Sequence, residues 1–297
     1  MKTDIDPHPL AAAPEKAPMG ETESADLDSS IVLRLAESDD EVIAAQRLRY
    51  NVFYEEFGAK PSAEVLAQKR DFDDYDQYAD HLIVFDTSRS AELGQIVGTY
   101  RLFRAERMPA DLPFYTTHEF DISPLLSCGG KLLELGRSCV LPEYRTKYVM
   151  QRLWQGIAGY LSTHEIDLMF GCASFQGTDP KAIEDQLAYL HYYHQPPENL
   201  YPKASPDCTV GLNFKPKEEL DVKRVFSDLP PLVKGYLRLG AYIGQGAYLD
   251  TDFNSIDVCI VLPTHKVTSK YMRHYERKLQ KDVVRDSDFS KNFKSSD

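Results

Sequence analysis

The chain has 297 residues, 42% of them hydrophobic and 27% charged, so it can bury a sizeable core as one large domain or two small ones. Its formal net charge of −12 at pH 7 argues against a protein that binds nucleic acid over its whole surface. No apolar run approaches the roughly 20 residues that a membrane-spanning helix requires.

The N-terminal sequence MKTDIDPHPLAAAPEKAP lacks the apolar core of a secretion signal. Residues 1–30 are rich in Ala, Pro, Glu, Asp and Ser, a composition typical of a disordered acidic tail. The five cysteines are scattered without the spacing of a metal site, and we expect them to be reduced, mostly core thiols. These features favour a cytoplasmic protein.

The first predicted elements are a strand over residues 31–38 and a helix over residues 39–57, which Ser38 caps. At about 100° per residue, Arg49 falls within the apolar stripe of this helix, and Phe53 follows one turn later on the same side. A buried arginine needs an acid or a ligand. Arg49 and Phe53 are therefore candidate substrate-binding residues, with a structural ion pair as the alternative for Arg49.

An acidic segment, RDFDDYDQYADH, follows at residues 70–81. Such a run is usually a solvated loop, but Phe72 and Tyr75 alternate with the acids and could anchor it to the body of the protein. An anchored loop could use Asp73 and Asp76 to bind a cation, such as the ammonium group of an amino acid. The glycine and the distant glutamate of an EF-hand calcium site are absent.

Two strands over residues 81–86 and 95–103 are joined by a polar turn and predict a hairpin. Arg101 lies in the second strand, as either an ion-pair partner or a ligand contact. The connection over residues 104–130 contains three prolines and is long enough to be a functional loop.

The most informative stretch is KLLELGRSCVLPEYRTKYVMQRLWQGIAGYL at residues 131–161. Its first part predicts a strand buried on both faces, and its last part predicts an amphipathic helix. Glu134 and Arg137 lie three apart in the strand, so they face opposite sides if the strand is regular. A bulge at Gly136 would turn both toward one cleft, where each needs a partner because an unpaired buried charge is very costly.

The turn between this strand and the helix is basic. Arg145 and Lys147 flank a helix start whose backbone N–H groups and positive dipole end suit an anion such as phosphate. A buried strand that carries an acid and leads into a phosphate-binding helix is typical of transferases that use acyl-CoA or acyl carrier protein.

The rest of the chain predicts strands over residues 167–173 and 257–262 and helices over residues 178–194 and 230–243. His191 and His194 lie one helical turn apart, but no third metal ligand is evident, so packing or surface roles are favoured. From Thr264 onward a basic helix is expected. It is either a solvated terminal helix or a patch for an acidic carrier protein or anionic lipid.

Several of these motifs occur together in the acyl-homoserine-lactone synthases, which are GNAT-like acyltransferases that use acyl carrier protein. The resemblance is carried by LRYNVF, DFDDYD, GTYRL and LELGRS. The later stretch LPPLVKGYLRLGAYIGQGAYLDTDFNSIDVCIVLP is similar to the ornithine N-acyltransferases that begin ornithine-lipid synthesis, and the resemblance spans residues 31–275. The tryptophan of the lactone synthases shortly after the Phe53 position is missing, which argues against lactone synthesis.

The resemblance implies a GNAT-like α/β domain over residues 31–263, in which helices flank a mixed, mostly antiparallel sheet, followed by a basic helix and tail over residues 264–297. It also implies transfer of a 3-hydroxyacyl group to the α-amine of L-ornithine, giving lyso-ornithine lipid. The donor would be the phosphopantetheine thioester of acyl carrier protein, with no further cofactor and no metal.

Roles for single residues follow from this resemblance together with their chemistry. Glu134 is the expected general base, because burial raises the pKa of a carboxylate. Backbone N–H groups near Ser138 and Cys139 would form the oxyanion hole. Three arginines would pair with the acidic loop or hold the ornithine carboxylate: Arg49, Arg101 and Arg137. Asp73 and Asp76 would order the loop or meet the side-chain ammonium. Five consecutive residues would bind the phosphopantetheine phosphate: Arg145, Thr146, Lys147, Tyr148 and Val149.

Other functions remain open at this stage. One is a lactone synthase or another amino-acid N-acyltransferase, and another is a non-catalytic module that binds a carrier protein or the cytoplasmic face of the membrane. Cys139 as an acyl-cysteine nucleophile is the alternative to direct transfer, although no histidine is near it in the sequence.

Overall fold

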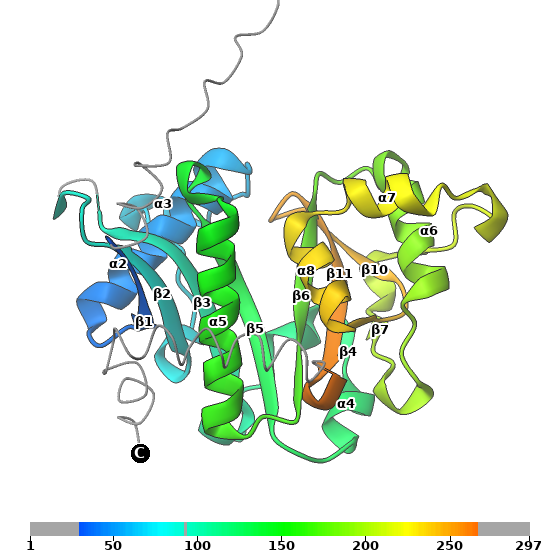
Figure 1. Cartoon of the computed structure of the whole chain (residues 1–297), viewed down its shortest axis with the longest axis horizontal. Helices are drawn as coiled ribbons and strands as arrows, with labels where there is room; N and C mark the ends of the chain where they lie inside the picture. Colours follow the sequence, from blue (N-terminus) through cyan, green and yellow to red (C-terminus); the bar gives the residue numbers. More distant parts are fainter. Residues whose placement is uncertain (1–29, 92–93, 267–297) are drawn as a thin grey trace, which may run out of the picture.

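The computed structural model describes residues 30–91 and 94–266, in which a nine-stranded sheet forms the centre of the molecule (Figure 1). Its strands follow the order β1-β2-β3-β5-β6-β11-β10-β8, and β9 pairs with β11. Neighbouring strands are antiparallel except for the parallel pair β5–β6, so the predicted mixed, mostly antiparallel sheet is confirmed. The strand bounds are β1 Ile31–Leu35, β2 Asp80–Asp86, β3 Ile96–Arg104, β5 Leu132–Val140, β6 Leu168–Gln176, β8 Thr209–Val210, β9 Tyr242–Ile243, β10 Ala247–Asp250 and β11 Ser255–Pro263.

Helices cover both faces of this sheet. The helix α2 packs on Ile83 of β2 and on Cys139 of β5, whereas α5 packs on the opposite face, where Leu82 of β2 meets Gly156. Figure 1 shows α5 in front of the first half of the sheet and α8 in front of the second half. The helix bounds are α2 Asp39–Tyr50, α3 Ala63–Gln68, α4 Ser123–Ser127, α5 Lys147–His164, α6 Glu184–Tyr193, α7 Val222–Asp228 and α8 Pro231–Leu239, and a small second sheet pairs β4 Phe120–Asp121 with β7 Lys203–Ala204.

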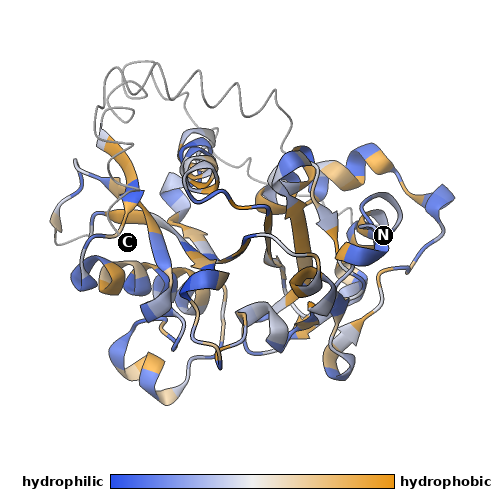
Figure 2. Cartoon of the chain, turned by 90° about the horizontal axis from the view of Figure 1, so that it is seen from below, coloured by the Kyte–Doolittle hydropathy of each residue, from blue (hydrophilic) through white to orange (hydrophobic). Residues whose placement is uncertain are grey.

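The elements expected from hydrophobic periodicity form where apolar side chains can be buried against the sheet. All five residues of the expected stripe on α5 are buried: Val149, Leu153, Ile157, Tyr160 and Leu161. Hydrophobic residues concentrate along the central strands, and the helices carry hydrophilic residues between their apolar ones (Figure 2). This agreement follows from the 3.6-residue period of a helix that has one buried face.

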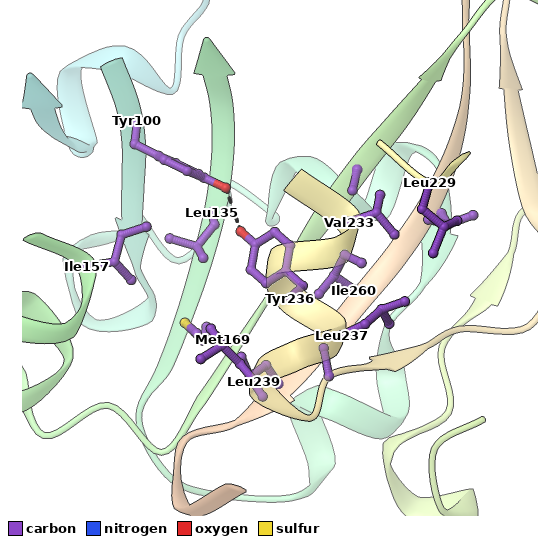
Figure 3. Packing of buried hydrophobic residues seen from close by; sticks show 14 of the residues in the cluster. Tyr100, Leu135, Ile157, Met169, Leu229, Val233, Tyr236, Leu237, Leu239 and Ile260 are labelled. Carbon is purple, nitrogen blue, oxygen red and sulfur yellow. Dashed lines mark hydrogen bonds between the residues drawn. The ribbon is translucent and has the colours of Figure 1, made fainter. Parts of the chain in front are cut away.

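The strands β5 and β6 separate after a short paired segment. Leu132–Glu134 pairs with Leu168–Phe170, but β5 continues to Val140 and β6 to Gln176 without further pairing between them. At the point of separation, a Cβ added to Gly171 would lie 2.1 Å from the backbone oxygen of Leu135, so only glycine fits there. On the α5 side, side chains of α8 pack between the strands, and the Tyr236 hydroxyl lies 2.5 Å from that of Tyr100 (Figure 3).

Several expectations concern residues outside the described part of the chain. The acidic tail of residues 1–29 and most of the basic segment after Thr264 lie there; of that segment, only Thr264–Lys266 is described, as a 3₁₀ turn. The described helices include none with the length and apolar character to cross a membrane. The short strands β8, β9 and β10 and the helices α3 and α7 were not expected, because segments this short carry little periodicity.

Candidate active site

The strand β5 carries the bulge that its sequence suggested. Thr99 of β3 pairs with Cys139 and Arg101 pairs with Gly136, so β5 contains one extra residue between these pairs. The residue with left-handed backbone conformation in this bulge is Arg137, whose φ is 50°. We had expected the bulge at Gly136. Glu134 and Arg137 therefore meet the same residue, Tyr115: its backbone N–H donates to Glu134, and its ring lies 4.7 Å from the Arg137 guanidinium carbon.

Glu134 is buried, with an exposed fraction of 4%, and its carboxylate accepts three hydrogen bonds. Thr116 donates its backbone N–H to Oε1 at 2.6 Å and also its hydroxyl, and Tyr115 donates its N–H to Oε2 at 2.9 Å. Burial raises the pKa of Glu134, and the three hydrogen bonds only partly oppose this effect. Since a carboxylate has about four acceptor positions, one on Oε2 remains for a proton donor.

Arg49 is completely buried and binds the acidic loop. Its Nη1 and Nη2 donate to the two carboxylate oxygens of Asp76 at 2.9 and 2.7 Å, and its Nε lies 2.7 Å from Asp71 Oδ2. Each of its three guanidinium nitrogens lies within 2.9 Å of a loop carboxylate oxygen, which favours the structural role over ligand binding. The expected anchoring by the loop aromatics is also seen, because Tyr75 is buried.

Arg101 and Arg137 complete the contacts with this loop. Arg101 Nη1 lies 2.6 Å from Asp73 Oδ1 and 3.1 Å from Asp76 Oδ1, and Arg137 Nη2 lies 3.3 Å from Asp73 Oδ2. Three arginines thus neutralise three aspartates, since Asp71 also contacts Arg137. Internal cations already contact these acids, which argues against the hypothesis that the loop binds a substrate ammonium. The loop-ordering role is the one observed.

Two aromatic side chains border Arg137. Phe253 lies in the turn between β10 and β11, and the centroid of its ring is 4.7 Å from the Arg137 guanidinium carbon. Phe53 packs edge-on against Phe253 with ring centroids 6.1 Å apart. Phe53 lies in a π-helical turn, Asn51–Glu56, which continues α2 and re-aims its side chains. Phe53 therefore contacts Phe253, which in turn contacts Arg137.

Ser138 and Cys139 have different surroundings. The Cys139 side chain is buried beneath α2, and burial raises the pKa of its thiol to about 12. Both features argue against the acyl-cysteine alternative, because the nucleophile would have to be the thiolate. Cys139 also resumes ladder pairing with Thr99, whereas Ser138 lies in the irregular stretch.

The start of α5 has the geometry of a capped helix. The Thr146 hydroxyl accepts the N–H of Val149 at 3.3 Å, and the Val149 side chain is buried in the core. Arg145 donates to both carboxylate oxygens of Glu56 at 2.6 Å and to the backbone oxygen of Val140. The N–H of Val149 and the Arg145 guanidinium are thus already engaged. Tyr148 lies in the first turn and is partly buried, and the Lys147 side chain is outside the described part.

The connection over residues 104–130 does contribute to the site, through side chains that sequence analysis did not single out. The 3₁₀ turn Tyr115–His118 supplies the donors to Glu134, and Glu119 follows it directly. Carboxylate oxygens of Glu119, Asp250 and Asp257 lie within 4.8 Å of one another. In the sequence, the sign of this group was Asp257, a charged residue at the start of the apolar run DVCIVL.

His191 and His194 lie near Gln195 and Tyr189, respectively, with hydrogen bonds that fit the packing or surface roles favoured from the sequence.

A sheet whose central parallel strands separate beside a bulge, with a buried carboxylate at that point and a helix start beyond it, defines an acyltransferase of the GNAT class. In agreement, the acetyltransferase (GNAT) domain family matches residues 48–155. An N-acyl amino acid synthase from uncultured soil microbes superposes with a TM-score of 0.46 and 13% identity, over 82% of this chain and 97% of that chain.

Curated relatives extend the match over most of the chain. An L-ornithine N(alpha)-acyltransferase of Brucella abortus is 45% identical over 249 residues, which cover 83% of this chain and 89% of the relative. One of Agrobacterium fabrum is 44% identical over 245 residues, with 82% and 84% covered. The chain belongs to the L-ornithine N(alpha)-acyltransferase family.

Proposed function

We propose that this enzyme transfers a 3-hydroxyacyl group from the phosphopantetheine thioester of acyl carrier protein to the α-amino group of L-ornithine, the first step toward an ornithine lipid. The observation that carries the proposal is the 45% identity to an L-ornithine N(alpha)-acyltransferase over 83% of this chain. A match over 83% of this chain necessarily spans the segments that hold Glu134, Arg137 and the acidic loop.

In the proposed reaction the ornithine α-ammonium first loses a proton to Glu134, directly or through a water molecule. The raised pKa of this carboxylate and its remaining acceptor position on Oε2 support that role. The neutral amine then attacks the thioester carbonyl, an N–C bond forms and the C–S bond breaks. The carrier thiolate leaves and takes up the second proton, which the nitrogen loses as the amide forms. Positioning of the two substrates supplies much of the acceleration, so no covalent enzyme intermediate is needed.

Two groups of the bulge have proposed binding roles. The N–H of Ser138 would stabilise the thioester oxyanion, because Ser138 lies where the β3–β5 pairing is interrupted. Arg137 is the arginine proposed to meet the ornithine carboxylate: its side chain is 13% exposed, whereas those of Arg49 and Arg101 are 0% and 4% exposed. A guanidinium that already contacts two aspartates would also be held in place for that contact.

The carrier protein is the proposed anionic partner. Its phosphopantetheine phosphate would lie at the N-terminus of α5, where the dipole of an 18-residue helix favours negative charge. The basic sequence after Thr264, which includes Lys270, Arg273 and Arg277, would meet the acidic carrier or anionic lipid at the cytoplasmic face of the membrane. Removing residues 267–297 should then raise KM for the carrier or reduce binding to anionic vesicles, and no change in either would refute this part.

The test is an assay with purified protein, 3-hydroxyacyl carrier protein and single amino acids, in which mass spectrometry detects the N-acyl product and a thiol reagent counts released carrier. We expect product with ornithine. Glu134→Gln should lower kcat by about 10²–10⁴-fold. The matched control is Glu165→Gln, because Glu165 has an 80% exposed side chain and pairs only with Lys131.

Product with another amino acid or with S-adenosylmethionine would replace the proposed acceptor. Absence of turnover with every acceptor, alongside tight binding of the carrier, would refute the enzyme and leave a binding module. An unchanged rate in Glu134→Gln would remove the base from the mechanism but keep the transfer reaction.

A further inference from the structure

A second group of acids lies near Glu134, and among the described residues no arginine forms an ion pair with it. Asp257 is in β11, Asp250 ends β10, and Glu119 follows the turn that supplies the donors to Glu134. We call these three residues the acid triad. Glu119 and Asp257 are each 4% exposed, and Asp250 is partly buried.

The triad is uncompensated, in contrast to the acidic loop. Within the described residues no lysine, arginine or histidine forms an ion pair with any of its three carboxylates, whereas each aspartate of the acidic-loop network contacts at least one arginine. A buried carboxylate without a cation is destabilising, so a protein retains such a group only where something offsets it. Burial first, and then the Asp257 charge, raises the pKa of Glu119 well above its ordinary value.

Unpartnered polar atoms point to a donor-rich ligand at this place. Glu119 Oε2 and Asp257 Oδ1 are buried and make no hydrogen bond. The hydroxyl oxygen of Ser255, a residue that is 1% exposed, is also unpartnered; it lies beside Asp257, and Ser255 pairs with Asp250 across the two strands. These three buried oxygens can each accept a hydrogen bond, which matches a primary ammonium with its three N–H donors and no acceptor.

The triad is connected to Glu134 through direct contacts. Thr116, which holds the Glu134 carboxylate, accepts the backbone N–H of Glu119 at 3.1 Å. The Cys172 sulfur donates to the Thr116 hydroxyl at 3.8 Å. Cys172 and Asp257 also lie on one face of the sheet, because Asp257 pairs with Ser174, two residues beyond Cys172. An amine at Glu134 and a cation at the triad would therefore be close together.

We infer that Glu119, Asp250 and Asp257 bind the terminal ammonium of the acceptor amino acid and so select a diamino acid over a neutral one. The inference rests on the proposed transfer to ornithine, whose two amines are separated by a short aliphatic chain. It assigns the cation-binding role, first expected of the acidic loop, to a group of acids that forms no ion pair within the described part of the chain.

The experiment compares ornithine with norvaline, which has the same carbon chain without the terminal amine, in the wild-type protein, Glu119→Gln and Asp257→Asn. The wild type should prefer ornithine in kcat/KM. Each variant should lower the ratio of the two kcat/KM values by about 10–100-fold, the range for losing a hydrogen bond to a charged group, with most of the change in KM for ornithine. Asp252→Asn is the control, because Asp252 lies in the adjoining turn with a 79% exposed side chain.

Several results would overturn the inference. One is equal use of norvaline and ornithine by the wild type, and another is an equal fall for both acceptors in the variants. Activity that is lost in EDTA and restored by Mg²⁺ or Mn²⁺ would show that the triad binds a metal ion instead. Thermal melting separates these effects from misfolding, since removing one of several buried like charges should not lower Tm.

A separate binding experiment distinguishes failure of the proposed transfer reaction from failure of the ammonium-binding inference. If the wild type acylates no acceptor, calorimetric titration with ornithine and norvaline decides the inference alone. Ornithine binding that is lost in Asp257→Asn, without norvaline binding in the wild type, would support the acid triad as an ammonium site. Absence of ornithine binding by the wild type would refute it.

Discussion

Asp76→Asn tests whether the arginine–aspartate network stabilises the fold. The Asp76 carboxylate accepts from Arg49 Nη1 at 2.9 Å and Nη2 at 2.7 Å, from Arg101 Nη1 at 3.1 Å and from Gln46 Nε2 at 2.9 Å. Asparagine offers only one oxygen, so its amide nitrogen would face two of these donors. The substitution also leaves the network of three arginines and three aspartates with one excess positive charge.

The expected loss is about 3–5 kcal/mol in the free energy of unfolding, the range for removing one partner of a buried ion pair. Two lost donors, at about 1.5–3 kcal/mol for each hydrogen bond to a charged group, give a similar figure. The near-complete burial of Arg49 places the change at the upper end, because water cannot replace the lost acceptor.

Urea unfolding followed by circular dichroism measures this change through the midpoint and the slope. The control is Asp252→Asn, whose exposed pair with Lys60 at 4.0 Å predicts a loss below about 1 kcal/mol. An equal effect of the two substitutions would refute the argument that the buried network is stabilising. A double variant, Arg49→Met with Asp76→Asn, should lose much less than the sum of the two single losses.

The same network predicts the response to acid. Burial alone would raise the pKa of Asp76, but the Arg49 charge and hydrogen bonds outweigh it, so the pKa lies well below the ordinary value of about 4. A depressed pKa adds stability that is fully present above about pH 4 and is lost as the pH falls through the folded-state value. Unfolding of the wild type should therefore depend more steeply on pH below about pH 4 than that of Asp76→Asn.

Three further predictions concern β5 and its neighbours. Thr116→Val removes a hydroxyl that lowers the pKa of Glu134, so the acid limb of the kcat/KM profile should move to higher pH; an unmoved limb would exclude Glu134 as the titrating base. Cys139→Ala should keep kcat within about 3-fold while lowering stability by about 1 kcal/mol, and a loss above about 100-fold in a folded variant would reinstate the thiol. Gly171→Ala should lower stability by more than about 3 kcal/mol in urea unfolding, because its φ is 155° and the new Cβ meets Leu135 oxygen at 2.1 Å. Gly136→Ala, with open space around its Cβ, should not lower it to that extent.

Much of the framework was predictable because hydrophobic periodicity is a local property. The stripe on α5, the buried position of Arg49 on α2 and the hairpin of β2 and β3 all depend on side chains within one or two turns or strands. The bulge in β5 was also foreseeable, since a strand that buries Glu134 and Arg137 must present both to partners. Its exact position was not, because the energy of the left-handed residue depends on the pairing with β3.

The sequence by itself determined the order of elements, the family motifs and the charges that must find partners. Only the tertiary structure decided which charges do so. Arg49, Arg101 and Arg137 come from three elements and converge on the acidic loop, where they pair with its aspartates. Glu119, Asp250 and Asp257 converge without an ion-pair partner among the residues that the structure describes. Pairing between segments distant in the sequence, such as β6 and β11, is set by sheet order and register, and local residue patterns carry no record of either.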